Sequence, residues 1–426
     1  MTIFNYIALS FVFSFILLNV NANGEEGADP PVTGVNAAEL HSFDELILAR
    51  LKEKNIAGAS AAIVKDGRLI YARGFGYADR EKKIPVEPTT LFRLASVSKP
   101  ITAVAMMNVL QNKKHGLALD TPVFAYLGLK PFTLPGHVAD PRIWKITIRN
   151  LLQHSGGWNR DKSGDIMFQH LQIAKEMGVS SPIKHESLIS WGMGRTLDFE
   201  PGKEYSYSNF GFCVLGRVIE KATGMTYEKY VQKNVLKPMD ITQMRIGKGS
   251  REDRFKDETV YYASENQMGQ SYLTADEGKQ LPLAYAFQSP EVMDAHGGWI
   301  ASAVDMARFA AKLNAASNGI LTVASEKELY SRPAKPLGLE SDGSPSPVFY
   351  GLGWQVRDLG ERNGINVWHG GGMPGTNTIL VRLSSGISWV LLFNGDGAGD
   401  IDGLMHAAAS KVRNWPQNDL FKIKSK

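Results

Sequence analysis

Residues 58–79, GASAAIVKDGRLIYARGFGYAD, hold two runs of strand-forming residues on either side of the dipeptide Asp66-Gly67. Asp-Gly is a favoured two-residue hairpin turn, because both positions tolerate the positive φ angles that such a turn requires. The stretch therefore predicts an antiparallel β-hairpin near the N-terminus.

Strand patterns return in the C-terminal part of the chain, beyond a mostly helical middle. They occupy residues 350–356, 365–371, 377–383 and 388–394. Apolar residues at helical spacing predict helices, with Ser302 as an N-cap and Gly224 as a stop. The expected helices are 37–55, 100–110, 210–224, 302–316 and 405–415.

Strands at both ends and helices between them predict an α+β fold. We expect one antiparallel sheet built from both chain ends, flanked by helices, with a mostly helical lobe inserted at about residues 110–290. This domain spans 37–415, and 416–426 form a solvated tail. A cleft between the two lobes is the expected place for a site, and the polar segment 247–294 either covers that cleft or is plain surface.

The composition is that of a globular protein, with 43% hydrophobic and 21% charged residues in 426 positions. The net charge is +4, and the basic residues are scattered, which argues against a nucleic-acid partner.

Residues 1–22 carry no charge, and their short apolar stretch is typical of an export signal; an uncleaved anchor is the alternative. We expect a periplasmic or secreted protein, with a linker at 23–36 and no membrane span after cleavage.

Cys213 is the single cysteine and lies in the apolar run FGFCVLG, so no intrachain disulfide can form. We expect a buried, inert thiol rather than a nucleophile. The chain lacks HExxH, and none of its nine histidines forms an HxH pair. These patterns argue against a zinc hydrolase, and we expect neither a metal nor another cofactor.

The segment 96–107, SVSKPITAVAMM, places Ser96 one helical turn before Lys99. A buried lysine of lowered pKa can act as the base that activates a serine nucleophile. The alternative is that Ser96 or Ser98 caps the helix and Lys99 is solvated. A second Ser-x-x-Lys occurs at Ser181, where the following Pro182 favours a helix N-cap.

Two further segments carry polar groups suited to acyl transfer. In EYSYSNF, Tyr207 can relay a proton and Asn209 can hold a substrate carbonyl; a polar loop with Asn209 as helix cap is the alternative. In WHGGGMPG, His369 precedes three glycines, Gly370, Gly371 and Gly372, whose bare backbone can accept a substrate as an added strand. A glycine-rich hairpin turn is the alternative there.

Together these motifs resemble the class C β-lactamase and D,D-peptidase family of serine hydrolases, which also includes esterases. The order is Ser-x-x-Lys, then Tyr-x-Asn, then a basic residue with glycines on a late strand. Flanking segments such as LFRLASVSKPITAVAMM, ITIRNLLQHSGG and GGWIASAVDMARF extend the resemblance over about residues 37–409. It implies a β-lactamase/transpeptidase-like fold, and Ser181 matches nothing in the pattern.

The resemblance also implies a mechanism and roles. Ser96 attacks an acyl carbon of a small-molecule or short-peptide substrate, Lys99 and Tyr207 share the acid/base work, and the Ser96 and Gly372 N–H groups form the oxyanion hole. Asn209, His369, Gly370 and Gly371 contribute to substrate binding. His154 is expected to be structural. Four tryptophans are candidates for the acyl pocket or for plain core, namely Trp158, Trp299, Trp354 and Trp368.

One departure bears on the substrate. Many members of the family have Lys-Thr-Gly where this chain has His369-Gly370-Gly371. A neutral histidine is a poor partner for a substrate carboxylate. We therefore expect an esterase or D-amino-acid peptidase, with a true β-lactamase or D,D-carboxypeptidase, or a non-catalytic peptidoglycan-binding protein, as the alternatives.

Overall fold

The structure is a computed structural model of the chain, and it describes residues 29–264, 267–271, 276, 278–286, 289–313 and 319–422. The predicted signal segment 1–22 lies outside these residues. In the part described, every helix is too short or too polar to cross a bilayer.

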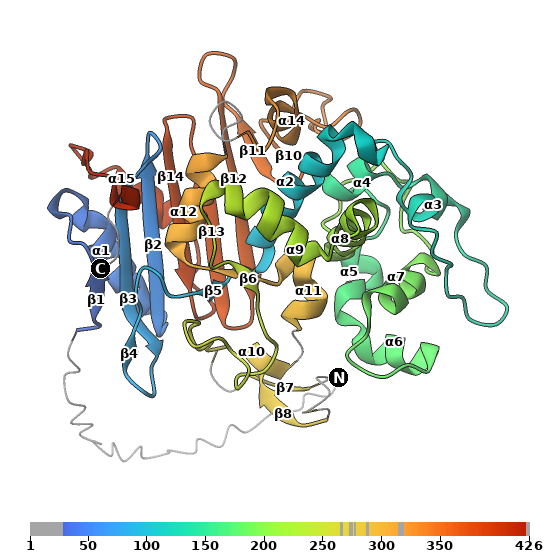
Figure 1. Cartoon of the computed structure of the whole chain (residues 1–426), viewed down its shortest axis with the longest axis horizontal. Coiled ribbons are helices and arrows are strands. Elements are labelled where there is room, and N and C mark those ends of the chain that lie inside the picture. Colours follow the sequence, from blue (N-terminus) through green and yellow to red (C-terminus); the bar gives the residue numbers. More distant parts are fainter. Residues whose placement is uncertain are drawn as a thin grey trace, which may run out of the picture.

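The central sheet is antiparallel and combines both ends of the chain (Figure 1). The predicted hairpin is confirmed as β2 (Gly58–Lys65) and β3 (Arg68–Asp79). The spatial order is β1-β3-β2-β14-β13-β12-β11-β10, with β4 beside β3. The remaining strands are β1 (Val32–Gly34), β4 (Ile84–Pro85), β10 (Val348–Tyr350), β11 (Gln355–Asp358), β12 (Ile365–Met373), β13 (Thr376–Arg382) and β14 (Ile387–Phe393).

The seam between the two chain ends is the pairing of β14 with β2, which runs from Ile387↔Lys65 to Phe393↔Ala59. Side chains alternate across a strand, so β14 supplies both faces of the sheet. Trp389 and Leu391 pack toward α1 (His41–Glu53) and α15 (Ile401–Ala409), whereas Val390 and Leu392 join the core on the opposite face. Burial of both faces explains the nearly unbroken apolar sequence of this strand.

The larger core lies between the opposite face of the sheet and the helices of that face and of the inserted lobe. Figure 1 shows how these helices are arranged beside the sheet. Here α12 (Ala303–Lys312) packs on β2 and β14, and α2 (Ser98–Gln111) packs against α8 (Asn209–Thr223). Ser302 caps α12 in a capping box with Asp305, and Gly224 ends α8 at φ 69°, as predicted. The other helices are α3 (Val123–Leu127), α4 (Ile148–Leu152), α5 (Arg160–Ser163), α6 (His170–Met177), α7 (His185–Met193), α9 (Tyr227–Val231), α10 (Leu283–Ala286), α11 (Pro290–Gly297) and α14 (Val323–Leu329).

Two small sheets complete the fold. The order β5 (Phe92–Arg93), β9 (Trp299–Ala301), β6 (Arg245–Ile246) forms one, and β7 (Met268–Gln270) pairs with β8 (Gln280–Pro282) in the other. The polar segment 247–294 includes the exposed β7–β8 pair, but it ends in α11, which is buried between α2 and α8. Neither interpretation of this segment anticipated a buried helix.

The predicted ends of the domain need correction. Residues 32–34 fall in the predicted linker, yet they form edge strand β1, which pairs with β3. The tail is not wholly solvated, because Leu420 and Phe421 in a short helical turn pack against the core and Asp419 accepts a hydrogen bond from the Leu69 N–H. The sequences of the predicted linker and tail contain no pattern that predicts these contacts, because the contacts depend on tertiary packing.

Candidate active site

Ser96 lies in a one-turn 3-10 helix, Ala95–Val97, between β5 and α2. Ala95 has a φ of 47°, in the left-handed region that costs an alanine about 1–2 kcal/mol. The N-cap of α2 is Val97, which makes no side-chain capping bond. The alternative that Ser96 or Ser98 caps this helix is therefore wrong.

The Ser96 turn is held by neighbouring strands. The Leu94 N–H donates to the Trp299 carbonyl of β9 at 2.9 Å, and the Thr378 hydroxyl of β13 donates to the Leu94 carbonyl at 2.8 Å. Because these bonds come from segments far apart in the chain, the strained turn is fixed by the assembled fold.

The Ser96 hydroxyl oxygen has two polar neighbours. Lys99 Nζ lies 3.0 Å from Ser96 Oγ, and the Tyr207 hydroxyl donates to the same oxygen at 2.7 Å. Both distances allow direct proton transfer. Two motifs 111 residues apart thus meet at one oxygen atom, as the sequence predicts.

Lys99 is completely buried, so the solvated alternative is wrong. Its Nζ also contacts Asn209 Oδ1 at 2.7 Å and the His296 carbonyl at 3.0 Å. Burial lowers the pKa of Lys99 well below its usual value; Asp165 opposes this shift and Arg160 adds to it. A buried amine of this kind can lose its proton and act as a base.

Asn209 is the first residue of α8, and Ser208, not Asn209, caps that helix by accepting from the Gly211 N–H. The Asn209 side chain bridges two buried titratable groups, because its Oδ1 accepts from Lys99 and its Nδ2 donates to Asp165 at 2.7 Å. Both ends of the Asn209 amide are therefore bonded within the hydrogen-bond network around Lys99. Its predicted contact with a substrate carbonyl stays a prediction.

Tyr207 stands in a tight aromatic environment. Its ring centroid lies 4.3 Å from that of His154, and the Arg160 guanidinium carbon lies 5.1 Å from the Tyr207 ring centroid. Burial raises the pKa of the Tyr207 hydroxyl, so this group carries its proton at neutral pH. His154 Nδ1 accepts from the Ser208 N–H at 3.1 Å, a structural contact that agrees with its predicted role.

Strand β12 brings its glycines against the Ser96 turn. The pairing with β11 stops at Trp368, so among the described strands nothing covers that edge of β12 from His369 to Met373. A Cβ on Gly371 would lie 2.4 Å from the Leu94 carbonyl oxygen and 3.1 Å from the Ser96 nitrogen, so only glycine fits. Gly370 and Gly372 have no such neighbour, and they leave an open backbone edge beside Ser96.

His369 is 3% exposed, and both of its ring nitrogens are engaged. Nδ1 lies 2.7 Å from the Gly370 carbonyl, which can only accept, so Nδ1 carries the proton. Nε2 is therefore the acceptor for the Tyr350 hydroxyl at 2.9 Å. Burial, with a smaller effect of Lys99, lowers the pKa of His369 to about 3, so the ring is neutral and has no free N–H.

Several sequence candidates lie outside this cluster. Ser181 does not cap a helix, because α7 begins at His185 with Lys184 as its N-cap. Cys213 is fully buried and burial raises the pKa of its thiol to about 12, which confirms an inert cysteine. Trp158, Trp299 and Trp354 belong to the larger core, and Trp368 packs against the smaller one; of the four, Trp158 also lines a small cavity with Tyr207 and Asp165. Among the described residues, no group of three His, Cys, Asp or Glu side chains is placed to hold a metal ion.

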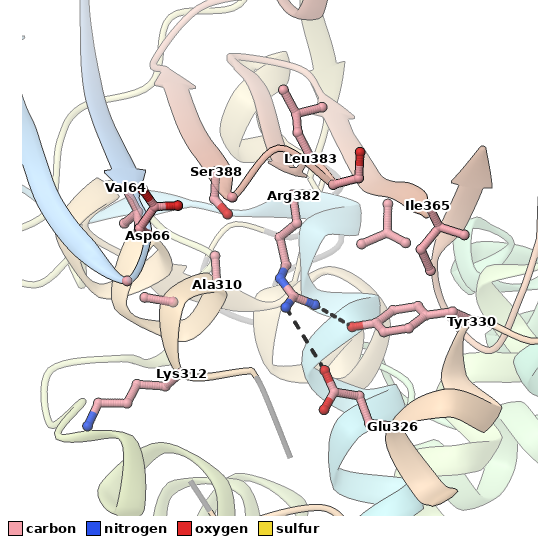
Figure 2. Close-up of a pocket in the computed structure, with 15 residues that line it drawn as sticks. Val64, Asp66, Ala310, Lys312, Glu326, Tyr330, Ile365, Arg382, Leu383 and Ser388 are labelled. Atoms are coloured by element: carbon pink, nitrogen blue, oxygen red, sulfur yellow. Dashed lines mark hydrogen bonds and ion pairs between the residues drawn. The ribbon is translucent and has the colours of Figure 1, made fainter. Parts of the chain in front are cut away.

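A cavity of about 700 Å³ lies away from this cluster, between α12, α14 and the ends of β2 and β13 (Figure 2). Arg382 occupies its centre and donates to the Tyr330 hydroxyl at 2.7 Å, with Glu326 at 4.0 Å. Ser96, Lys99 and Tyr207 are not part of its lining. Its arginine is already paired, and the cavity is not the site described above.

Three contributors to the site were not predicted from the sequence. Asp165 and the His296 carbonyl reach Asn209 and Lys99 from a loop and from α11, and Tyr350 fixes His369. The Ser289-Pro290 dipeptide was an available signal for the start of α11, because proline is favoured at the first helical position. Asp165 had no comparable signal.

Comparison with known proteins agrees with this geometry. Residues 43–412 match the family model described as Beta-lactamase. The chain belongs to the beta-lactamase family. This membership makes the protein a serine hydrolase by class, and the predicted α+β fold of the family is confirmed.

Individual members of the beta-lactamase family differ in their activities. The chain is 25% identical to "Penicillin-binding protein 4*" of Bacillus subtilis over 340 residues, which are 79% of this chain and 68% of the relative. It is 34% identical to "Esterase EstB" of Burkholderia gladioli over 217 residues, about half of each protein (50% and 53%). The structure of an octameric penicillin-binding protein homologue from Pyrococcus abyssi shares the fold, with a TM-score of 0.65 and 24% identity over 87% of this chain and 77% of that one.

Proposed function

We propose that the protein is an exported serine hydrolase that forms an acyl-enzyme at Ser96 and cleaves esters, or amides, whose leaving group carries no carboxylate. The observation that carries this proposal is the pair of contacts on Ser96 Oγ, from Lys99 Nζ at 3.0 Å and from the Tyr207 hydroxyl at 2.7 Å. The esterase among the relatives supports it.

The surroundings of Lys99 support its role as the base. A neutral amine has two protons and one lone pair. The Asn209 Oδ1 and His296 carbonyl oxygens can only accept hydrogen bonds, so each accepts one from the two N–H groups of the amine. The lone pair is then directed at the third neighbour, Ser96 Oγ. The serine proton can pass to Lys99 as Oγ attacks the acyl carbon.

Tyr207 is placed to complete the step as the acid. Attack of Oγ on the acyl carbon gives a tetrahedral intermediate; when it collapses, the bond from carbon to the leaving oxygen breaks, and that oxygen takes the Tyr207 proton. Lys99 returns its proton to Tyr207. Water then attacks the acyl carbon, one of its protons passes through the Lys99–Tyr207 pair to Ser96 Oγ, and the bond from Oγ to the acyl carbon breaks. The Ser96 and Gly372 N–H groups are the proposed oxyanion donors, because Gly371 brings β12 against the Ser96 turn.

The state of His369 supports a leaving group without a carboxylate. A C-terminal carboxylate or a β-lactam carboxylate is bound most strongly by a cation or a free N–H. His369 offers neither, because it is neutral and both ring nitrogens are engaged. For the same reason a β-lactamase or D,D-carboxypeptidase is the less favoured activity. A non-catalytic binding protein has no need of a buried Lys99 aligned with Ser96.

Parallel kinetics on three substrates test this proposal. We expect kcat/KM for p-nitrophenyl acetate to exceed that for nitrocefin and for a D-Ala-D-Ala peptide by at least about tenfold, because the loss of one charged hydrogen bond costs that much or more. Ser96→Ala supplies the background rate for each substrate. Nitrocefin turnover above ester turnover would overturn the interpretation of His369.

A further inference from the structure

A second cavity, of about 340 Å³, lies beside the candidate active site. We call it the aromatic side pocket and define it by Tyr205, Tyr350, Leu337, Leu339, Val348 and Phe349, which line it. Its volume falls in the range that holds small ligands. None of the described residues that line it carries a charge, and apolar or aromatic side chains dominate.

Side-chain contacts connect the wall of this pocket to the candidate active site. The Tyr350 hydroxyl bonds His369 at 2.9 Å, and the Tyr205 and Tyr350 ring centroids are 5.8 Å apart. His154 links the two sides, with its ring centroid 4.5 Å from that of Tyr350 and 4.3 Å from that of Tyr207. Tyr205 remains 50% exposed, so a substrate can reach the pocket past its ring.

The direction in which the leaving group departs decides what enters the pocket. Lys99 occupies the buried side of Ser96, and Tyr207 lies on the side toward His369, with ring centroids 6.4 Å apart. The leaving oxygen must approach Tyr207 to receive its proton. The group attached to that oxygen then lies beside Tyr207, and the His154 ring leads from there to Tyr350 and the aromatic side pocket.

We propose that the aromatic side pocket binds the apolar alcohol portion of the substrate, which makes esters of medium-length or aromatic alcohols the preferred class. This assignment rests on the proposed function. An alcohol chain gains by leaving water for a wall of leucine, valine and tyrosine side chains, by about fourfold in binding per methylene. A charged leaving group would find no partner among the lining residues described.

Acetate esters of ethanol, butanol and hexanol test the proposal, because the acyl group is constant and the three alcohols have similar acidity. In a pH-stat assay we expect kcat/KM to rise about fourfold per methylene until the cavity is filled. Leu339→Trp and Val348→Trp fill the pocket, and we expect each to bring the hexyl-to-ethyl ratio close to one. Val323→Trp adds the same side chain at a position 70% exposed and outside the pocket, and the ratio should stay at the wild-type value.

A second series, ethyl acetate, butanoate and hexanoate, lengthens the acyl group instead. We expect the pocket-filling variants to leave the ratios in this series within about twofold of wild type. A hexyl-to-ethyl ratio of kcat/KM near one in the wild type, or a ratio that both pocket-filling variants leave unchanged, would overturn the assignment of the pocket. The proposal of ester hydrolysis would still stand. An effect confined to the acyl series would assign the pocket to the other half of the substrate and overturn the proposal. Absence of Ser96-dependent turnover of any ester would instead refute the proposed function itself.

Discussion

A Lys99→Met variant is expected to lose about 10³-fold or more in kcat/KM for p-nitrophenyl acetate. Methionine keeps the length of the side chain in the buried site but removes the base that takes the Ser96 proton, and such groups contribute about 10²–10⁴-fold. Stopped-flow or steady-state assays give the rate, and thermal unfolding by circular dichroism checks that the variant is folded.

The pH profile separates a base from a merely structural lysine. Burial lowers the pKa of Lys99, and the active form is the neutral one. Wild-type kcat/KM should therefore rise with pH as Lys99 loses its proton and fall as pH decreases through that pKa. This limb should be missing from the residual activity of Lys99→Met, and Lys99→Arg should stay inactive because guanidinium does not deprotonate. A Lys99→Arg enzyme with wild-type activity would contradict the assignment.

A Tyr207→Phe variant is expected to lose about 10²–10³-fold on ethyl acetate but clearly less on p-nitrophenyl acetate. The p-nitrophenolate ion leaves without a proton, whereas ethoxide needs the one that Tyr207 supplies. The comparison of kcat for the two esters therefore measures the acid role. Burial raises the pKa of Tyr207, so its proton is present throughout the neutral range.

The matched control for this variant is Tyr126→Phe, which removes the same hydroxyl from a helix of the inserted lobe. Tyr126 lies in α3, away from Ser96, and its substitution should change both rates by less than about twofold. Equal losses on both esters in Tyr207→Phe would indicate that the tyrosine only positions Ser96.

Local patterns predicted much of the fold because the physics that specifies them is local. The Asp66-Gly67 turn, the Ser302 capping box and the glycine stop at Gly224 each depend on a few consecutive residues. The joining of both chain ends in one sheet could also be predicted. The middle of the sequence is mostly helical, so the strands expected at the two ends had only each other to pair with. Strand β1 was missed, because three residues in a polar segment become a strand only by pairing with β3.

The candidate site likewise combines residues that local motifs predicted with residues that no local pattern marks. Ser96, Lys99, Tyr207 and Asn209 stood in recognisable motifs, and the fold brings all four together. Their supporting groups come from other segments and have no local signature. The Tyr350 bond to His369 is the most consequential of these, because it ties up the one ring nitrogen that a substrate carboxylate would need. The sequence showed that a lysine was missing, and only the assembled structure shows that the histidine does not replace it.

Covalent labelling of Ser96 tests the central claim most directly. A fluorophosphonate probe forms a stable bond with an activated serine, and intact-mass and peptide-mapping spectrometry locate the adduct. We expect one adduct per wild-type chain, on the peptide that contains Ser96, and none on the Ser96→Ala variant. A wild-type protein that stays unlabelled, or an adduct at Cys213 or any other residue that persists in Ser96→Ala, would contradict the account.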